Sequence, residues 1–526
     1  MITFFNANIF DSVTESAIAI DGNKIIALGS DKTILDNYGK VADSYNLNGM
    51  TIWPGLIDSH IHLGQLARSL RIVDCETKTL ADCLIRVSEH AALHPEFNWI
   101  EGHGWNQNEW DDAHFGTAQQ LDTVTGDRPA YLTAKSLHAA WANSKALSLA
   151  QIDESSKDPE GGVIIRDPAG KPNGILLESA MNLVERIIPK SSPSRIIDDL
   201  MIVQQHLWEM GITGIHDYDG PEVFQALQSL KGRDRLNLRI QKNFPISELE
   251  NLITIGLYSG FGDDLLHTGS IKLFADGALG PQTAAMLEPY ENSESKGILL
   301  LSRQDLFDIG VKAVKNGWSL TIHAIGDKAN HDVLDGLSDL RKFEDSHNIP
   351  HLPHRIEHAQ LVQPEDQVRF KMLGITASVQ PIHCTSDMNN VDKYWGSRAS
   401  NAYPIRNLLD LKTHVVFGSD APVESANPFY GIHAAVTRRR QDGTPNPEGW
   451  QPSQRITLRE AVNAYTINVS TLSGMENRCG KVRPGYYADL IVFPVDPFVI
   501  AEQDLYKIKP VLTMVNGQVV YKSSNL

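Results

Sequence analysis

Short apolar runs alternate with amphipathic stretches through the middle of the chain. Each run is rich in Val, Ile, Leu and Phe, which is typical of strands in a parallel sheet buried on both faces. Between residues 52 and 420 this pattern predicts about ten strands, near residues 52–60, 97–103, 129–134, 212–217, 238–244, 270–275, 320–323, 355–358, 375–379 and 415–419. The segments between the later runs are long enough for helices, so repeated strand–helix units are expected.

Two of these strands, 97–103 and 129–134, fall in a stretch from about residue 65 to 200 that lacks regular strand–helix spacing. We interpret that stretch as an insertion after the first barrel strand. The remaining eight strands predict a (β/α)8 barrel of the TIM type, so the expected fold class is α/β.

The two ends of the chain are β-rich. Residues 2–10 and 16–20 have strand character at one end, and residues 488–493 and 511–515 have it at the other. Asn516-Gly517 is a strong hairpin signal. We therefore predict that residues 1–53 and 480–526 assemble one composite β-sandwich domain. Residues 54–479 would then form the barrel with its inserted subdomain.

Composition and charge narrow the range of functions. The formal net charge of −17 over 526 residues argues against a nucleic-acid-binding surface. The four cysteines include no Cys-x-x-Cys pair, which favours reduced thiols over a disulfide framework. The N-terminus lacks the basic region of a signal peptide, and no apolar run approaches the roughly 20 residues that span a bilayer. We expect a cytoplasmic protein that binds neither nucleic acid nor membrane.

Six polar residues lie at the C-terminal ends of predicted strands. They are His60, His62, Lys272, His323, His358 and Asp420. Side chains alternate along a strand, so the histidines at 60 and 62 point the same way. The C-terminal strand ends of a (β/α)8 barrel line its active site, so all six residues are expected to meet there. Four neutral imidazoles and one carboxylate can hold one or two divalent ions, with Zn²⁺ as the default.

Lys272 is the unusual member of this set. A cation repels a protonated lysine, so Lys272 would ligate only as a carbamate, which is anionic and could bridge two ions. Alternatively, Lys272 is an ordinary charged group that binds substrate or pairs with Asp276. Asp420 ends the last strand and is the natural general base toward a metal-activated water.

Longer motifs surround these residues and resemble a known family. They comprise residues 54–62 (PGLIDSHIH), 138–147 (HAAWANSKAL), 272–280 (KLFADGALG) and 355–360 (RIEHAQ). Together they resemble the amidohydrolase-3 subgroup of the amidohydrolase superfamily, which includes N-substituted formamide deformylases, and the likeness covers essentially the whole chain. One departure is Ser136-Leu137 before His138, where the family often has Asp-Gly.

This resemblance implies zinc-dependent hydrolysis of a C–N bond. His60 and His62 would hold the more buried ion, and His323 and His358 would hold the second. A carboxylated Lys272 would bridge the two ions, so two ions per chain are favoured over one. Asp420 would be both ligand and base.

Further residues are candidates for substrate contacts. The insertion supplies Trp105, Trp110 and Asn143 as a pocket wall, with His138 polarising the substrate carbonyl. The simpler alternative is that the tryptophans pack in the core. His216 ends the second barrel strand and could contact substrate or support the ligands.

Other polar residues receive structural interpretations or stay open. His383 follows the seventh strand, and the same two roles are open to it as to His216. Arg355 and Glu357 alternate with His358, so we expect them to face away from it as members of an ion pair. His354, with His331 and His351, is interpreted as solvated.

Three functions compete on this evidence. The leading hypothesis is a zinc amidohydrolase acting on an amide or N-formyl bond of a small molecule. The same metals could instead act on a lactone, carbamate or phosphoester. A non-catalytic scaffold would be expected to lack ligands, whereas all six are present. The expected partner is a small-molecule amide, and a homodimer remains open.

Overall fold

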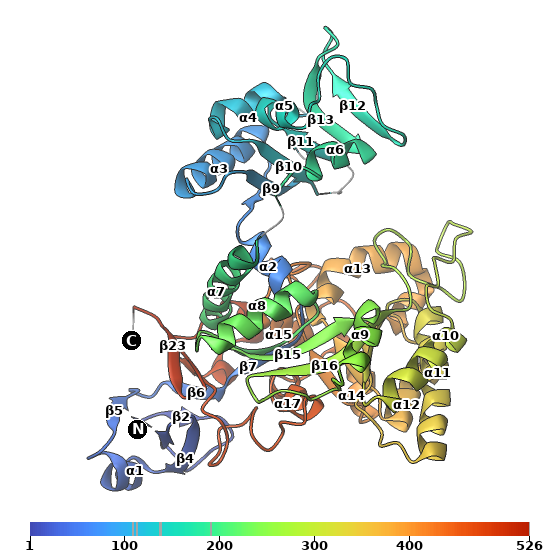
Figure 1. The fold of residues 1–526 in the computed structure, drawn as a ribbon. Coiled ribbons are helices and arrows are strands. Elements are labelled where there is room, and N and C mark those ends of the chain that lie inside the picture. Colours follow the sequence, from blue (N-terminus) through green and yellow to red (C-terminus); the bar gives the residue numbers. More distant parts are fainter. Residues whose placement is uncertain (108–109, 112–113, 136–138, 190–191, 525–526) are drawn as a thin grey trace. The chain divides into compact units, whose positions relative to one another are not determined.

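The computed structural model describes residues 1–107, 110–111, 114–135, 139–189 and 192–524. The chain divides into two compact units. The first contains residues 1–65 and 197–526, and the second contains residues 66–196. Figure 1 shows the elements of each unit along the chain.

An eight-stranded parallel sheet dominates the first unit. In spatial order it contains β7 (Leu56–Ile61), β14 (Ile212–Asp217), β15 (Arg239–Pro245), β16 (Leu266–Phe274), β17 (Leu320–Ala324), β18 (Arg355–His358), β19 (Thr376–Val379) and β20 (Val415–Phe417). The segment after β20 returns to β7, because Asp420 N donates to His60 O at 2.7 Å and His62 N donates to Ala421 O at 2.9 Å. The strands therefore close into the predicted (β/α)8 barrel, and the predicted fold class is confirmed.

Helices cover the outside of this barrel (Figure 1). They include α8 (Pro221–Gly232), α9 (Leu249–Thr254), α10 (Arg303–Lys315), α11 (Asp327–His347), α12 (Pro364–Leu373), α14 (Ile405–Asp410), α15 (Pro428–Thr437), α16 (Leu458–Ala464) and α17 (Ile467–Leu472). Burial on both faces suits an apolar strand such as β20, whose residues Val415, Val416 and Phe417 are all buried. Helix α12 ends at Gly374, whose φ of 63° suits the left-handed cap that stops the helix.

The predicted strand at 52–60 is two strands in two different sheets. β6 (Thr51–Pro54) pairs antiparallel with β21 (Leu490–Phe493), whereas β7 enters the barrel. Gly55 separates them, and a Cβ at this position would collide with the side chain of Thr213. The expectation of a single strand is wrong because the chain turns at Pro54-Gly55, where only glycine allows such a close approach.

Two small sheets are built from the ends of the chain, one from both ends and one from the N-terminal end alone. One contains β2 (Asn8–Ile9), β6, β21, β22 (Leu512–Val515) and β23 (Gln518–Lys522), and the other contains β1 (Ile2–Phe5), β3 (Ala17–Asp21), β4 (Lys24–Gly29) and β5 (Asp43–Asn46). Helix α1 (Asp31–Tyr38) follows β4. Phe4 and Ile18 from the N-terminal strands share one core with Leu490 and Met514 from the C-terminal strands.

The second unit has a six-stranded mixed sheet of its own. It contains β8 (Val73–Asp74), β9 (Ile100–Trp105), β10 (Ala130–Ala134), β11 (Ala139–Ala142), β12 (Gly162–Arg166) and β13 (Pro172–Glu178). Its helices are α3 (Leu80–Leu93), α4 (Ala118–Thr125), α5 (Ser144–Leu149) and α6 (Asn182–Glu185). The strands expected at 97–103 and 129–134 are therefore β9 and β10, which lie in this sheet and not in the barrel.

In the sequence, helix α2 (Leu63–Ser69) precedes the strands of the second unit and helix α7 (Pro193–Glu209) follows them. Among the residues described, none of the helices combines the length and the apolar character needed to cross a membrane.

His354 is fully buried, so the expectation of a solvated side chain is wrong. Its Nδ1 accepts a hydrogen bond from Leu320 N at 3.0 Å, and its Nε2 lies 3.3 Å from Glu344 Oε1. The residue precedes β18, where it supports the start of β17, and burial lowers its pKa. A proton on Nδ1 would break the bond from Leu320.

Acid should destabilise the fold through His354. Its folded-state pKa is depressed, so the unfolded state binds more protons below about pH 6.5, and stability falls as the pH drops. We expect His354→Gln to reduce the slope of the free energy of unfolding against pH by up to about 1.4 kcal/mol per pH unit. Urea unfolding between about pH 7.5 and about pH 5.5 measures it. His351→Gln, at a half-exposed site, is the control; equal slopes for His354→Gln and wild type would contradict the prediction.

Candidate metal centre

The six predicted ligands come from strand ends at the same end of the barrel. His60 is in β7, Lys272 in β16, His323 in β17 and His358 in β18, while Asp420 follows β20. His358 and Asp420 have φ values of 71° and 60°, an uncommon conformation for residues other than glycine. Such strain is found where a site must hold a side chain in a set direction.

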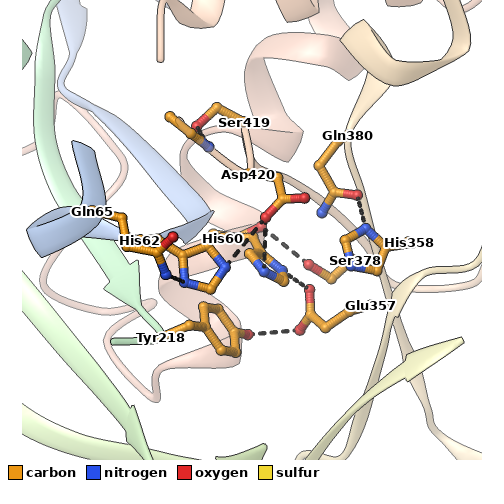
Figure 2. A network of polar contacts seen from close by, with 12 residues as sticks. His60, His62, Gln65, Tyr218, Glu357, His358, Ser378, Gln380, Ser419 and Asp420 are labelled. Carbon is orange, nitrogen blue, oxygen red and sulfur yellow. Dashed lines mark hydrogen bonds and ion pairs between the residues drawn. The ribbon is translucent and has the colours of Figure 1, made fainter. Parts of the chain in front are cut away.

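Asp420 is the centre of the group (Figure 2). Its Oδ1 lies 3.4 Å from His60 Nε2 and 3.5 Å from His62 Nε2. These three side chains could hold one metal ion among them. Burial favours the neutral acid, but interactions with His60 and His62 outweigh it and hold the pKa of Asp420 well below its usual range. The site therefore contains an ionised carboxylate facing two imidazoles.

Each of the four predicted histidine ligands has one ring nitrogen engaged by the protein. The pairs are His60 Nδ1 with Glu357 Oε2 at 2.6 Å, His62 Nδ1 with Asp219 Oδ1 at 3.5 Å, His323 Nε2 with Gly277 O at 2.9 Å, and His358 Nδ1 with Gln380 Oε1 at 2.8 Å. Metal-ligating histidines usually donate their other N–H to a carboxylate or carbonyl. These contacts therefore fix each ring and leave its second nitrogen for a metal.

The open nitrogens have the properties that a cation site requires. His60 Nε2 is buried and has no hydrogen-bond partner. Burial lowers the pKa of His60 and of His323 to about 4, so both imidazoles are neutral and their lone pairs are available. Burial opposes a charge on His62, but Asp219 and Asp420 outweigh it and raise its pKa to about 9. Positive charge is thus favoured beside His62, and the group of His60, His62 and Asp420 fits a divalent ion.

Lys272 points into the same region. Its Nζ lies 4.7 Å from the ring centre of Tyr218, and its side chain is buried. Burial lowers its pKa to about 8. The alternative pairing with Asp276 does not occur, because the Asp276 carboxylate accepts backbone N–H groups of residues 285, 325 and 326.

Glu357 is the main support of His60, a role that the sequence analysis missed. Its Oε1 accepts hydrogen bonds from Tyr218 Oη at 2.7 Å and Thr321 Oγ1 at 2.5 Å, and lies 2.9 Å from Arg355 Nε. The expected ion pair between Arg355 and Glu357 is present, and Glu357 also reaches His60, another of the predicted ligands. The left-handed backbone at His358 breaks the strand alternation, so neighbouring side chains both reach the interior.

His216 supports this network and does not present a free nitrogen to substrate. Its Nδ1 lies 3.0 Å from Arg355 Nη1, and its Nε2 lies 2.9 Å from Ser473 Oγ. Both ring nitrogens have partners within the protein, and the side chain is buried. The chain of contacts runs from Ser473 through His216, Arg355 and Glu357 to His60.

Within the second unit, Trp105, Trp110 and Asn143 have structural roles. Trp105 is fully buried and its Nε1 donates to Leu132 O at 2.8 Å. Trp110 packs in the same apolar cluster, 6.0 Å from Trp105 between ring centres. Asn143 caps α5 by accepting from Ala146 N. These contacts are the core packing and helix capping of the simpler interpretation, and the substrate contacts of these residues stay a prediction. His138 lies outside the described residues.

Two further residues near the ligands were not predicted. Tyr218 stacks on His60 with ring centres 4.0 Å apart, and Asp219 lies beside His62. Their signal in the sequence is the run Asp217-Tyr218-Asp219 at the C-terminal end of β14, the kind of position that marked the six ligands.

We expect Glu357→Gln to weaken zinc binding by about 10–100-fold, the usual cost of losing a support behind a ligand. Glutamine keeps the shape but removes the charge that holds the His60 Nδ1–H. Competition with a chromophoric chelator measures this affinity. Glu460→Gln, at a partly exposed ion pair of α16, is the control. Equal affinities for Glu357→Gln and wild type would show that Glu357 has only a structural role.

The whole chain matches known proteins in sequence. The model of the amidohydrolase family matches residues 43–521. This chain belongs to the amidohydrolase family. The resemblance inferred from the motifs is therefore confirmed, and with it the general class of metal-dependent amidohydrolases.

Relatives extend over the full length of this family member. YtcJ of Bacillus subtilis (strain 168) is 30% identical over 516 residues, covering 97% of this chain and 96% of the relative. The N-substituted formamide deformylase of Arthrobacter pascens is 27% identical over 530 residues, covering 96% and 95%. The crystal structure of a metal-dependent hydrolase from Pyrococcus furiosus is similar with a TM-score of 0.77 and 27% identity, covering 94% of this chain and 99% of that chain.

Proposed function

We propose that this amidohydrolase is a zinc enzyme that hydrolyses the C–N bond of an N-substituted formamide or a similar small amide. The observation that carries the proposal is the set of four histidines described above, each with one ring nitrogen held by the protein and one left open around Asp420. Likeness to the N-substituted formamide deformylase of Arthrobacter pascens supports the bond type.

The ligands divide between two ion positions in this proposal. His60, His62 and Asp420 hold the first ion, and His323 and His358 contribute to the second. A bound zinc ion supplies a Lewis acid that polarises a carbonyl oxygen and makes water a better nucleophile at neutral pH. His60 and His323 are neutral because burial keeps their pKa values near 4.

Asp420 acts as the base in this proposal. It is ionised because its pKa is held well below the usual range. The carboxylate can therefore accept a proton from the attacking water while it remains close to the ligands. The same carboxyl group can then give this proton to the nitrogen of the departing amine.

Lys272 is carboxylated in this proposal. A neutral amine adds to CO2 to give a carbamate and a proton, and the pKa of about 8 leaves roughly a tenth of the amine neutral at pH 7. The resulting carbamate is anionic and could bridge the two ion positions. Nζ lies 4.7 and 4.9 Å from the ring centres of Tyr218 and Phe274. Burial nevertheless outweighs the attraction of Glu357 and Asp420 for a cation, so the neutral amine is more accessible than in an exposed lysine.

The test is hydrolysis by the purified protein after metal removal and reloading with zinc and bicarbonate. We expect release of formate and amine from N-substituted formamides, and loss of this activity with chelator. A panel of lactones, carbamates and phosphoesters of similar size measures selectivity. No bound metal and no activity on any member of the panel would overturn the proposal, while activity confined to esters would overturn the C–N assignment.

A further inference from the structure

His383 lies beside the metal centre, although it is not one of the six ligands that the motifs assign. It lies in the first turn of α13 (Pro381–Trp395), which begins directly after β19. The residue is 7% exposed, and its Nε2 is buried with no hydrogen-bond partner. A polar atom in this state needs a ligand, because an unpaired buried nitrogen is costly.

The unpaired nitrogen faces Asp420. His383 Nε2 lies 3.8 Å from Asp420 Oδ2, too far for a hydrogen bond. Ligand atoms of a tetrahedral zinc ion, with bonds of 2.0–2.1 Å, are roughly 3.3–3.4 Å apart. The separation of 3.8 Å is therefore close to that of two atoms sharing an ion. His358 completes the group, and the three side chains could hold one ion among them.

Asp420 thus has two faces. Its Oδ1 faces His60 and His62, at 3.4 and 3.5 Å, and its Oδ2 faces His383. Two groups of ligands share this one carboxylate, one on each oxygen. A carboxylate with a separate donor set on each oxygen is suited to bridge two cations.

The fold holds His383 and His358 in place together. Gln380 is the residue before α13, and its Oε1 accepts from His358 Nδ1 at 2.8 Å, which directs His358 Nε2 away from it. One helical turn later, the His383 backbone N–H donates to Gln380 O at 3.0 Å. The rings of His358 and His383 lie nearly parallel, with an interplanar angle of 11° and centres 6.0 Å apart. Cys384 and Met388 anchor the helix in an apolar core.

We propose that His383 is a ligand of the second ion, which it holds with His358 and Asp420 Oδ2. This inference rests on the proposed metal-dependent function and deepens it. It adds to the second position a ligand from the end of the seventh strand, and it makes Asp420 a bridge between the two ions. The second ion is then held by protein side chains even when Lys272 carries no carboxylate.

Cobalt(II) titration tests the assignment without any assay of activity. The metal-free protein is titrated in bicarbonate buffer, and the absorption of bound Co²⁺ is followed. We expect two equivalents in wild type, and in His383→Asn a second equivalent weakened by more than about 100-fold, with the first unchanged. His267→Asn is the matched control. His267 is also buried with an unpaired Nε2, but it lies at the opposite end of β16 from Lys272.

A cysteine variant gives a positive signal from the same position. In His383→Cys, a thiolate bound to Co²⁺ adds a near-ultraviolet charge-transfer band that appears with the second equivalent. The wild-type spectrum is the reference, because wild type already contains the buried Cys384, the residue after His383. This band also provides a result if the asparagine variant fails to fold.

The outcomes separate the two hypotheses. One result would overturn the role of His383 and leave the proposed function standing. Wild type and His383→Asn would bind two equivalents of Co²⁺ with the same affinities, and His383→Cys would show no charge-transfer band. If wild type binds a single ion and His383→Asn still binds it, the role of His383 is also overturned and the proposed function again stands. If wild type binds neither Co²⁺ nor Zn²⁺, both the role of His383 and the proposed function are wrong.

Discussion

Asp420→Asn should reduce kcat on an N-substituted formamide by about 10²–10⁴-fold, the range that a general acid–base group supplies. Asparagine keeps an oxygen and the shape of the side chain, but it cannot accept a proton. It also removes the negative charge between His60 and His62, which lie 3.4 and 3.5 Å from Oδ1. The measurement is kcat of the zinc-loaded protein, with metal content determined on the same sample.

The control for this change is a buried aspartate outside the centre. Asp366 is 1% exposed and pairs with His331 and Arg369. We expect folded, zinc-loaded Asp366→Asn to keep the wild-type kcat. A decrease of less than about 10-fold in Asp420→Asn, at full metal content, would exclude Asp420 as the base.

Lys242→Met should lower the free energy of unfolding by about 3–5 kcal/mol, the cost of removing one partner of a buried ion pair. Lys242 Nζ lies 2.7 Å from Asp217 Oδ2, and both side chains are fully buried. Asp217 also accepts from Leu63 N at 2.9 Å, and Leu63 is the residue after His62. Methionine fills the space of the lysine but leaves the carboxylate without its counter-charge. Urea unfolding followed by circular dichroism measures the loss.

An exposed ion pair provides the comparison. Lys342 lies 2.9 Å from Asp339, but its side chain is 73% exposed. Solvent screens such a pair, so Lys342→Met should change stability by less than about 1 kcal/mol. Adding Asp217→Asn to Lys242→Met removes the unpaired charge and should recover part of the loss. Equal effects of the two lysine changes would mean that burial does not strengthen the Lys242 pair.

The barrel and its candidate ligands could be predicted from the sequence for physical reasons. A parallel strand that is covered on both faces buries most of its side chains, so several barrel strands, such as β20, are recognisable as apolar runs. The C-terminal ends of such strands meet in one place, so His60, Lys272, His323, His358 and Asp420 could be grouped before any distance was known. The break at Pro54-Gly55 could not be located within its run, because it depends on the contact of Gly55 with Thr213.

The residues around the ligands are a different case. Glu357 contacts His60 across 297 positions in sequence, and His216 contacts Ser473 across 257. No local pattern encodes such pairs, since they form only when the barrel closes. For Trp105 and Asn143, the sequence motif suggested a role that the local contacts do not display. The motif suggested substrate contacts, whereas in the second unit Trp105 packs in an apolar core and Asn143 caps a helix.

The sequence by itself determined the fold class, the family and the strand ends that present the predicted metal ligands. These follow from periodicity and from motifs whose residues are close along the chain. Only the tertiary structure decided which nitrogen of each histidine is engaged, that Glu357 supports His60, and that His383 faces the second oxygen of Asp420. The reason is that ring orientation and carboxylate direction are set by partners from other strands, which the linear order does not bring together.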